Sequence, residues 1–279
     1  MPWEVTDDVE VYAERAWPLL AARPAENTIA LTVIETVRAA YGWSDETMVF
    51  GWYDDGRVSG AVSMISPYEL LLAVMPHGSV DELAAELRAR EVFVPGVHGE
   101  VGVVERFAAA WIAGTSWRAV TTLHLRLYAL SALRPLPVPP AGRARRACGE
   151  DFGIAVRWLT AFHGETGGPA VDLEAVVRNL TDNGLLWVWE DSTGAVVSLA
   201  GRKATAAGVA RVAPVYTPPE NRRCGYGAAV TTACTSDALR CGAQQVVLFT
   251  DLANPTSNSI YQQIGYRPIS DRTIVRFRQ

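Results

Sequence analysis

The 279-residue sequence lacks several patterns that would mark a particular class of function. Its four cysteines form no C-x-x-C pair, and none of its cysteines and four histidines stand at a metal-ligand spacing. No apolar run reaches the ~18 residues of a membrane span, and the acidic start, MPWEVTDDVE, has no apolar signal core. A net charge of −5 gives no broad cationic surface. We therefore expect a cytoplasmic protein with reduced thiols, no metal, and neither nucleic acid nor a membrane as partner.

The composition, with 49% hydrophobic and 20% charged residues, is typical of a globular protein. Its length suits one large domain or two of ordinary size. The clearest break is RPLPVPPAGRARR at 134–146, where four prolines and a glycine precede the arginines. Because proline lacks an N–H donor, neither a helix nor a strand ladder is easily sustained there. We predict a linker at 135–146 between domains at 1–134 and 147–279.

The C-terminal half alternates between helical and strand patterns. Apolar residues of EDFGIAVRWLTAFHG at 150–164 recur at helical spacing, and the polar turn DSTG at 191–194 joins two β-branched and aromatic segments. Gly242 is a natural end for the helix before it. The expected helices are 150–164, 171–181, 225–241 and 255–264, and the expected strands are 144–149, 185–191, 195–204, 208–217, 244–250 and 272–277.

The N-terminal half gives a similar series. We expect helices at 7–22, 27–40, 79–89 and 101–113, strands at 47–53, 57–65, 69–75 and 123–130, and an apolar segment, VFVPGV, before the last helix. This predicts a structural repeat without an evident sequence repeat.

A glycine-bearing turn joins a strand to a helix in VAPVYTPPENRRCGYGAAV at 212–230. Gly225 and Gly227 remove side chains where the chain turns, and the first helical turn leaves backbone N–H groups unpaired at a positive dipole end. With Arg222 and Arg223 beside them, these groups suit a phosphate or pyrophosphate. The alternative is a tight turn with solvated arginines. The segment lacks the lysine of a Walker P-loop and the G-x-G-x-x-G of a dinucleotide-binding turn.

A second polar segment, TDLANPTSNSIYQQIGY at 250–266, opens another helix. Asn254 can cap this helix, and a proline suits its first position. Asn254, Ser257, Asn258 and Tyr261 recur at spacings of three and four, so they can share one face. This face indicates a bound ligand, although a capped and solvated surface helix would have the same pattern.

The two segments, in this order, resemble the GNAT acetyltransferase superfamily. Arg222-x-x-Gly225-x-Gly227 is similar to its Arg/Gln-x-x-Gly-x-Gly/Ala signature, and the segment from Asn254 to Tyr266 is similar to its next motif. The resemblance covers about 145–279 and implies an α/β (α+β) fold of two tandem domains, each a mixed, mostly antiparallel sheet flanked by helices. The corresponding N-terminal segment, MPHGSVDEL at 75–83, has no arginine, which implies a degenerate copy without cofactor binding.

The resemblance also implies acetyl-CoA as cosubstrate. The pyrophosphate would rest on the amides of about Arg223 to Ala228, and the pantetheine arm would lie along the preceding strand. By matching position, cofactor binding falls to Ala213, Val215, Arg222, Arg223, Cys224, Gly225, Tyr226, Gly227, Ala228, Asn254, Ser257, Asn258 and Tyr261.

For catalysis, Tyr261 occupies the position of the family's general acid, unless it only packs against the cofactor. The strand at 208–217 carries no carboxylate, so the base is open between Glu165, His163, Glu190 and a water chain. Cys224, next to an arginine and a helix start, invites a covalent hypothesis, but the sequence shows no catalytic His/Asn constellation with it.

The predicted function is therefore acetyl transfer from acetyl-CoA to a primary amine by direct attack. The acceptor could be a small amine, an aminoglycoside, an amino acid or a peptide terminus, and the protein could be a monomer or a homodimer. Two alternatives stay open: a non-catalytic module that binds or senses acyl-CoA, and a transferase for a longer acyl or an aminoacyl group.

Overall fold

The computed structural model describes residues 2–39, 47–168 and 170–279, and the chain forms two compact units. The first unit comprises Met1–Leu127, Asp251–Ala253 and Ser270–Gln279, and the second comprises Tyr128–Thr250 and Asn254–Ile269. Two strands, β6 (Arg118–Leu130) and β12 (Tyr266–Arg278), have residues in both units. The end of the chain thus belongs to the unit in which the chain begins.

The first unit is built on a mixed sheet with strand order β1-β2-β3-β4-β5-β12. Neighbouring strands are antiparallel except for β4 and β5, which are parallel. The last strand pairs through Arg272–Arg276 with Gly96–Glu100. The other strands of this sheet are β1 (Trp3–Thr6), β2 (Met48–Asp54), β3 (Val58–Ile65), β4 (Leu70–Val74) and β5 (Gly96–Glu100).

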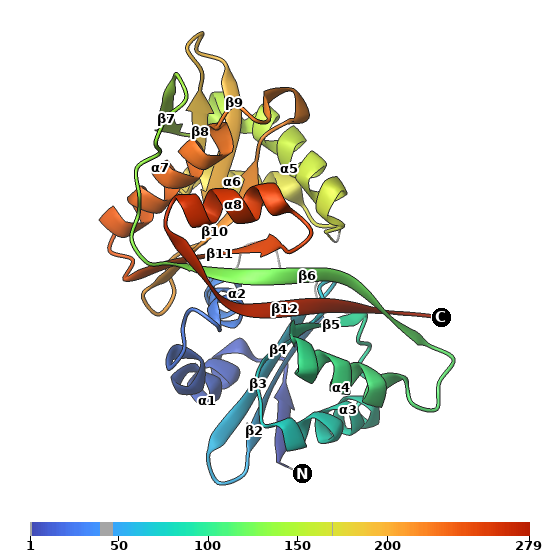
Figure 1. Ribbon diagram of the computed structural model, residues 1–279. Coiled ribbons are helices and arrows are strands. Elements are labelled where there is room, and N and C mark those ends of the chain that lie inside the picture. The colour runs from blue at the N-terminus through green and yellow to red at the C-terminus, as the bar shows by residue number, and fades with distance from the viewer. Residues whose placement is uncertain (1, 40–46, 169) are drawn as a thin grey trace. The chain divides into compact units, whose positions relative to one another are not determined.

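Helices cover both faces of this sheet (Figure 1). One face carries α1 (Val9–Ala21) and α2 (Thr28–Arg38), and the other carries α3 (Val80–Ala89) and α4 (Val101–Ile112), with a short 3-10 turn, η1 (His77–Ser79), before α3. The carboxylate of Asp8 accepts hydrogen bonds from the Glu10 and Val11 amides and so caps α1.

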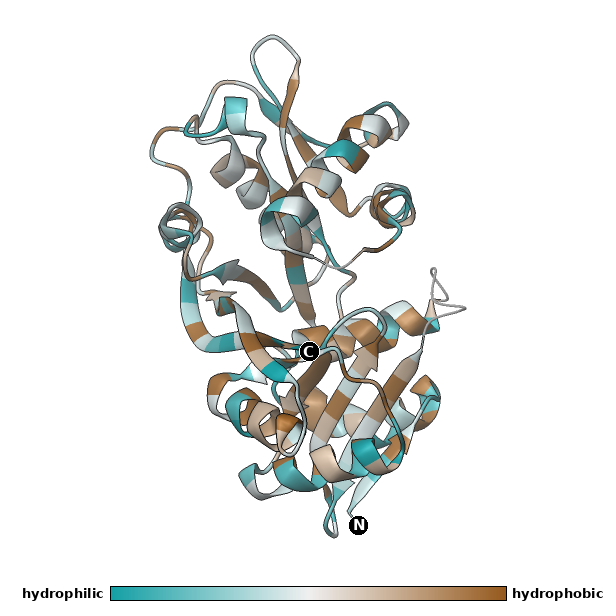
Figure 2. Cartoon of the chain, turned by 90° about the vertical axis from the view of Figure 1, so that its right-hand side faces the viewer, coloured by the Kyte–Doolittle hydropathy of each residue, from teal (hydrophilic) through white to brown (hydrophobic). Residues whose placement is uncertain are grey.

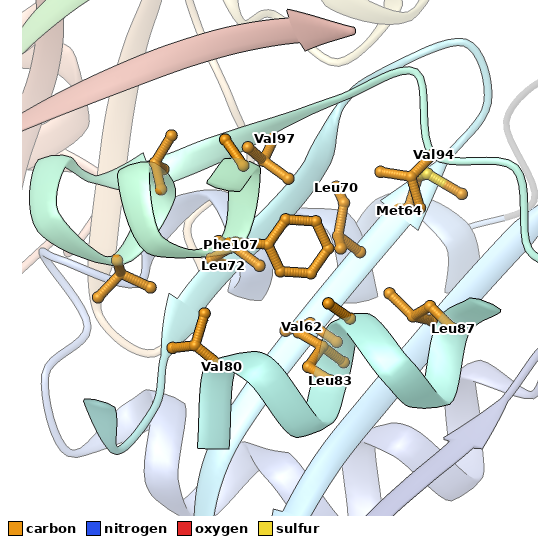
Figure 3. Close-up of a cluster of buried hydrophobic side chains, with 14 of the residues drawn as sticks. Val62, Met64, Leu70, Leu72, Val80, Leu83, Leu87, Val94, Val97 and Phe107 are labelled. Carbon is orange, nitrogen blue, oxygen red and sulfur yellow. The ribbon is translucent and has the colours of Figure 1, made fainter. Parts of the chain in front are cut away.

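The core of the first unit lies between the sheet and the pair α3 and α4 (Figure 3). The ring of Phe107, on α4, is fully buried among Leu70 and Leu72 of β4 and Leu83 of α3. Each such side chain contributes about 1.5–3 kcal/mol by leaving water. Figure 2 shows hydrophobic residues concentrated on the central strands of this unit.

The second unit has a sheet in the order β11-β10-β9-β8-β7. Only β10 and β11 are parallel, and the other neighbours are antiparallel. Its strands are β7 (Arg143–Arg146), β8 (Leu186–Glu190), β9 (Val196–Arg202), β10 (Val209–Tyr216) and β11 (Gln245–Asp251).

Side chains alternate across this second sheet, so each face has its own core. Leu186 and Val188 of β8 pack with α5 (Phe152–Thr166) and α6 (Leu173–Asp182), whereas Trp189 of β8 packs with α7 (Tyr226–Arg240) and α8 (Pro255–Gln263). Two 3-10 turns, η2 (Gly149–Asp151) and η3 (Pro219–Asn221), precede α5 and the glycine turn before α7. Figure 1 shows α5 and α7 on opposite sides of the strands.

The predicted fold class is confirmed: both units are mixed, mostly antiparallel sheets flanked by helices. Several strands differ from the expectations. The strand β5 lies at Gly96–Glu100, where only an apolar segment was expected, and β6 begins at Arg118 where the strand was expected from 123. The strand β1 was not predicted, and β12 runs over Tyr266–Arg278 where a strand was expected only at 272–277. Arg143–Arg146, at the end of the predicted linker, form β7. Among the described residues, no helix combines the length and apolar character of a membrane span.

Candidate functional site

In the second unit, β10 and β11 pair over only part of their length. The parallel register joins Val209–Val212 to Gln245–Leu248 and, within the described chain, goes no further. Against β9, the register of β10 shifts between Val212 and Val215, as a β-bulge does when it bends a strand. The predicted contacts Ala213 and Val215 lie in this half-buried stretch, on either side of Pro214, which has no N–H. An extended ligand could add to such an unpaired strand edge.

The glycine turn follows β10 and leads into α7. Arg223 and Gly225 both adopt the left-handed conformation, with φ of 66° and 81°, and Gly225 is the N-cap of α7. Ala229 N–H donates to the Gly225 carbonyl at 3.0 Å. Over the described residues, the amides from Arg223 to Ala228 donate no hydrogen bond to the protein. Six consecutive donors are therefore available at one helix start.

The surroundings of this turn suit an anion. The helix α7 has 15 residues and no acidic residue in its first turn, so its positive dipole end is not neutralised. A side chain at Gly227 would bring a Cβ atom to 3.2 Å from Thr217 Oγ1, so glycine leaves room there that another residue would fill. Donors, charge and space fit a diphosphate group.

Arg222, beside the turn, is held by Glu165 from the end of α5. Its Nη2 atom donates to both carboxylate oxygens, at 2.7 and 2.8 Å, while its Nε donates to the Thr217 carbonyl at 2.9 Å. The Tyr216 hydroxyl donates to Glu165 Oε1 at 3.2 Å. Burial and the Glu165 charge raise the pKa of Tyr216. Two predicted site residues, Arg222 and Glu165, are thus in direct contact.

The other two candidate bases have different surroundings. Glu190 accepts from Arg145 Nε at 2.5 Å and from Arg143 Nε at 2.8 Å, and these hydrogen bonds lower the pKa of its carboxyl. Because a carboxylate with a lowered pKa is a weaker base, these contacts favour a structural role for Glu190. His163 is half-buried near the end of α5, and in the described part of the chain its Nδ1 has no hydrogen-bond partner.

The polar face of α8 has the predicted cap. Asn254 Oδ1 accepts from the Ser257 amide at 3.0 Å, and Asn258 Nδ2 donates to the Asn254 carbonyl at 2.8 Å. Tyr261 is buried, in the same apolar cluster as Ala228 of α7, and burial raises its pKa to about 12. The structure thus brings α7 and Tyr261 into one core.

One neighbour of this face was not predicted from the sequence. Tyr128, from the end of β6, is fully buried, and its hydroxyl donates to Asn258 Oδ1 at 2.9 Å. Gln262 Nε2 donates to the same hydroxyl at 3.1 Å. The segment LHLRLYAL predicts a strand but carries no signal for this contact, because Tyr128 and Asn258 are 130 residues apart.

The first unit repeats the strand arrangement with different chemistry at the turn. Its β4 and β5 are parallel, and its β3–β4 register shifts between Ala61 and Val62. However, Asp81 and Glu82 lie in the first turn of α3, where their charge opposes a phosphate.

Among the described residues, no group of histidine, cysteine and acidic side chains could hold a metal ion. A comparison with curated proteins found no match.

The FR47-like protein family matches residues 193–275, which include β10, the glycine turn, α7 and α8. Three solved structures are similar in fold. A Drosophila protein is 15% identical, with a TM-score of 0.68 and coverage of 99% of this chain and 98% of that one. A GCN5-related N-acetyltransferase from Sphaerobacter thermophilus is 16% identical, with a TM-score of 0.65 and coverage of 99% and 95%.

The third structure, a tandem GNAT protein from the clavulanic acid biosynthesis pathway, is 14% identical, with a TM-score of 0.56 and coverage of 99% and 98%. Residues 193–275 therefore match the FR47-like protein family, and the two-unit fold of the chain is that of the GNAT structures, a tandem GNAT protein among them.

Proposed function

We propose that the second unit transfers an acetyl group from acetyl-CoA to a primary amine. One observation carries the proposal: the unbonded amides from Arg223 to Ala228 stand directly after the strand, β10, that separates from its parallel neighbour. An anion cradle beside an open strand edge suits a long cosubstrate with a diphosphate at one end. Bound acetyl-CoA would supply the thioester whose carbonyl carbon the amine attacks.

Different parts of β10 and of the turn after it would bind different parts of acetyl-CoA. The amides of the glycine turn would hold the diphosphate, and the edge at Ala213 and Val215 would align the extended arm. A backbone N–H at the bulge would donate to the thioester carbonyl oxygen, and losing such a donor typically costs ~10²–10³ in rate. Asn254, Ser257 and Asn258 would border the same site from α8.

Tyr261 would donate its O–H toward the departing sulfur. A pKa of about 12 keeps this phenol protonated at neutral pH. An ordinary thiol has a pKa of about 8.5, so full transfer to a thiolate would be uphill by about 5 kcal/mol. The burial of Tyr261 therefore favours a hydrogen bond that stabilises the developing thiolate, with protonation completed from solvent.

The contacts of the candidate bases narrow the route for the amine proton. Glu190 is hydrogen-bonded to two arginines, and Glu165 is hydrogen-bonded to Arg222 beside the glycine turn. Because Glu190 and Glu165 are engaged by arginines, we propose His163, whose Nδ1 has no partner among the described residues, or a water chain as the route for this proton. The acidic first turn of α3 supports a first unit that binds no diphosphate.

The experiment is a thiol-release assay with acetyl-CoA and a panel of small amines, aminoglycosides, amino acids and peptides, paired with calorimetry of CoA binding. Thiol release that depends on one acceptor class supports the proposal and identifies the acceptor. Binding heat without release by any acceptor would instead favour the acyl-CoA sensing module, which the unassigned base motivates. Release from longer acyl-CoA alone would favour the longer-acyl transferase. Absence of binding heat would contradict all three.

A further inference from the structure

The hydroxyl of Tyr128 joins two successive turns of α8. Tyr128 is fully buried, and a buried tyrosine hydroxyl requires hydrogen-bond partners. It has one on each side: it donates to Asn258 Oδ1 at 2.9 Å and accepts from Gln262 Nε2 at 3.1 Å. Asn258 and Gln262 are four residues apart, so they lie on one face of α8, one turn from each other. One side chain from outside the helix therefore sets the rotation of that face.

The helix α8 has few other anchors. It has nine residues, and Tyr261 is its only buried one. Isolated helices shorter than ~12–15 residues are marginal in water, so contacts with the rest of the unit must hold α8 in place. Its position then depends on Tyr261, Ile260 and the buried C-cap residue Ile264, which pack in one apolar cluster, and on the two hydrogen bonds to Tyr128.

Tyr261 lies between the two groups that Tyr128 holds, three residues after Asn258 and one before Gln262. The rings of Tyr128 and Tyr261 have centroids 6.5 Å apart. On another side, the ring of Tyr266 meets Tyr261 edge-to-face at 6.2 Å, and the Tyr266 hydroxyl bonds to Thr235 Oγ1 of α7 at 2.7 Å. The ring of Tyr261 is thus packed against two tyrosines whose hydroxyls are themselves hydrogen-bonded.

We infer that Tyr128 is a positioning residue for acyl transfer, which acts through α8 to aim the Tyr261 hydroxyl. The inference rests on the proposed function for its catalytic consequence. It assigns the C-terminal chemistry a residue from β6, outside the 193–275 family match and before the predicted linker. A segment that begins at residue 147 would lack it.

The test is Tyr128→Phe in the full-length chain, alone and combined with Tyr261→Phe. Tyr12→Phe is the matched control, because Tyr12 is also a fully buried tyrosine but belongs to the first unit, whereas α8 belongs to the second. We expect Tyr128→Phe to lower kcat roughly 5- to 50-fold, the size expected for two lost hydrogen bonds. The KM for acetyl-CoA should stay within about twofold, and the control should keep wild-type kcat.

The double variant separates positioning from general destabilisation. If Tyr128 acts through Tyr261, adding Tyr128→Phe to Tyr261→Phe should lower kcat by less than about twofold, since coupled residues are not additive. An equal loss in both backgrounds, or unchanged kcat in Tyr128→Phe, would overturn the inference.

Hydrogen exchange provides a readout that needs no activity. The amides of α8 should exchange faster in Tyr128→Phe than in wild type or in Tyr12→Phe, while those of α7 stay as slow as before. Unchanged α8 exchange would overturn the inference even if the wild-type protein proved inactive. An inactive wild type with faster α8 exchange would sustain the role of Tyr128 in holding α8 and contradict the proposed function alone.

Discussion

The contact between Arg222 and Glu165 allows two roles for Glu165, and the variant Glu165→Gln distinguishes them. In the structure, the Glu165 carboxylate accepts two hydrogen bonds from the Arg222 guanidinium, which lies beside the proposed diphosphate site. If Glu165 competes with the diphosphate for Arg222, removing its charge should tighten binding of acetyl-CoA. If Glu165 is the catalytic base, the same change should leave binding alone and lower kcat about 10²–10⁴-fold.

The size of the competitive effect follows from the exposure of the pair. The Arg222 and Glu165 side chains are 43% and 48% exposed, so water and salt screen the interaction. Exposed ion pairs contribute about 0.2–1 kcal/mol. Removing the competitor should therefore lower the Kd for acetyl-CoA by roughly 1.4- to 5-fold, with a larger effect at low ionic strength.

Calorimetry at two salt concentrations, with kcat measured on the same preparations, distinguishes the two roles. Glu174→Gln is the matched control, because it makes the same charge change at an exposed position on α6. We expect a lower Kd for Glu165→Gln and no change for Glu174→Gln. A Kd that rises, or one that falls equally in both variants, would refute the competition argument.

Four further changes test other parts of the site and its support. Tyr261→Phe should keep the Kd for acetyl-CoA within about twofold and lower kcat at least tenfold in steady-state assays; because burial raises the pKa of Tyr261 to about 12, its ionisation should cause no loss of wild-type activity below pH 10. Gly225→Ala, at a φ of 81°, should weaken acetyl-CoA binding severalfold by calorimetry, since the strain there costs about 1–2 kcal/mol. Asp237→Asn should lower the unfolding free energy in urea by about 3–5 kcal/mol, because buried Arg202 would lose its carboxylate partner. Cys224→Ser should keep wild-type kcat, and a loss of activity there would revive the covalent hypothesis.

The wild-type pH dependence of stability is expected to carry a contribution from Asp237. Burial alone would raise the pKa of this carboxyl, but hydrogen bonds from Arg146 and the nearby guanidinium of Arg202 lower it below its usual value. A carboxyl with a lowered folded-state pKa stabilises the protein above its unfolded pKa, near 3.9, and this contribution disappears as pH falls through the folded value. Urea titrations from pH 7 to pH 3 should show a smaller loss for Asp237→Asn than for wild type.

Most elements could be predicted because their signals are local. Apolar periodicity, a glycine stop and a polar turn lie within a few residues of the element they define, and α7, expected at 225–241, spans Tyr226–Arg240. The strand β1 has only four residues, too few to establish alternation. No local pattern predicts that Arg272–Arg276 pair with Gly96–Glu100, because the sequence of a strand does not specify which strand it pairs with.

The candidate site likewise combines local motifs, which the sequence shows, with contacts between distant residues, which it does not. The glycine turn and the Asn254 cap are local motifs, so their residues could be named from the sequence. The contacts that decide how those residues act are not local: Glu165 reaches Arg222 across 57 residues, and Tyr128 reaches Asn258 across 130. Such contacts depend on which strands and helices come together, which a single sequence does not specify.

The two units have one architecture but differ at the turn where we propose that the second unit binds a diphosphate. Their sheets share a parallel strand pair and a shifted register, features that depend on apolar alternation over dozens of residues. The proposed diphosphate site depends on far fewer residues: a left-handed Gly225 and a helix start without acidic side chains, where the other unit has Asp81 and Glu82. Because core and turn draw on separate residues, substitutions in the turn of the first unit could remove anion binding while its fold stayed intact.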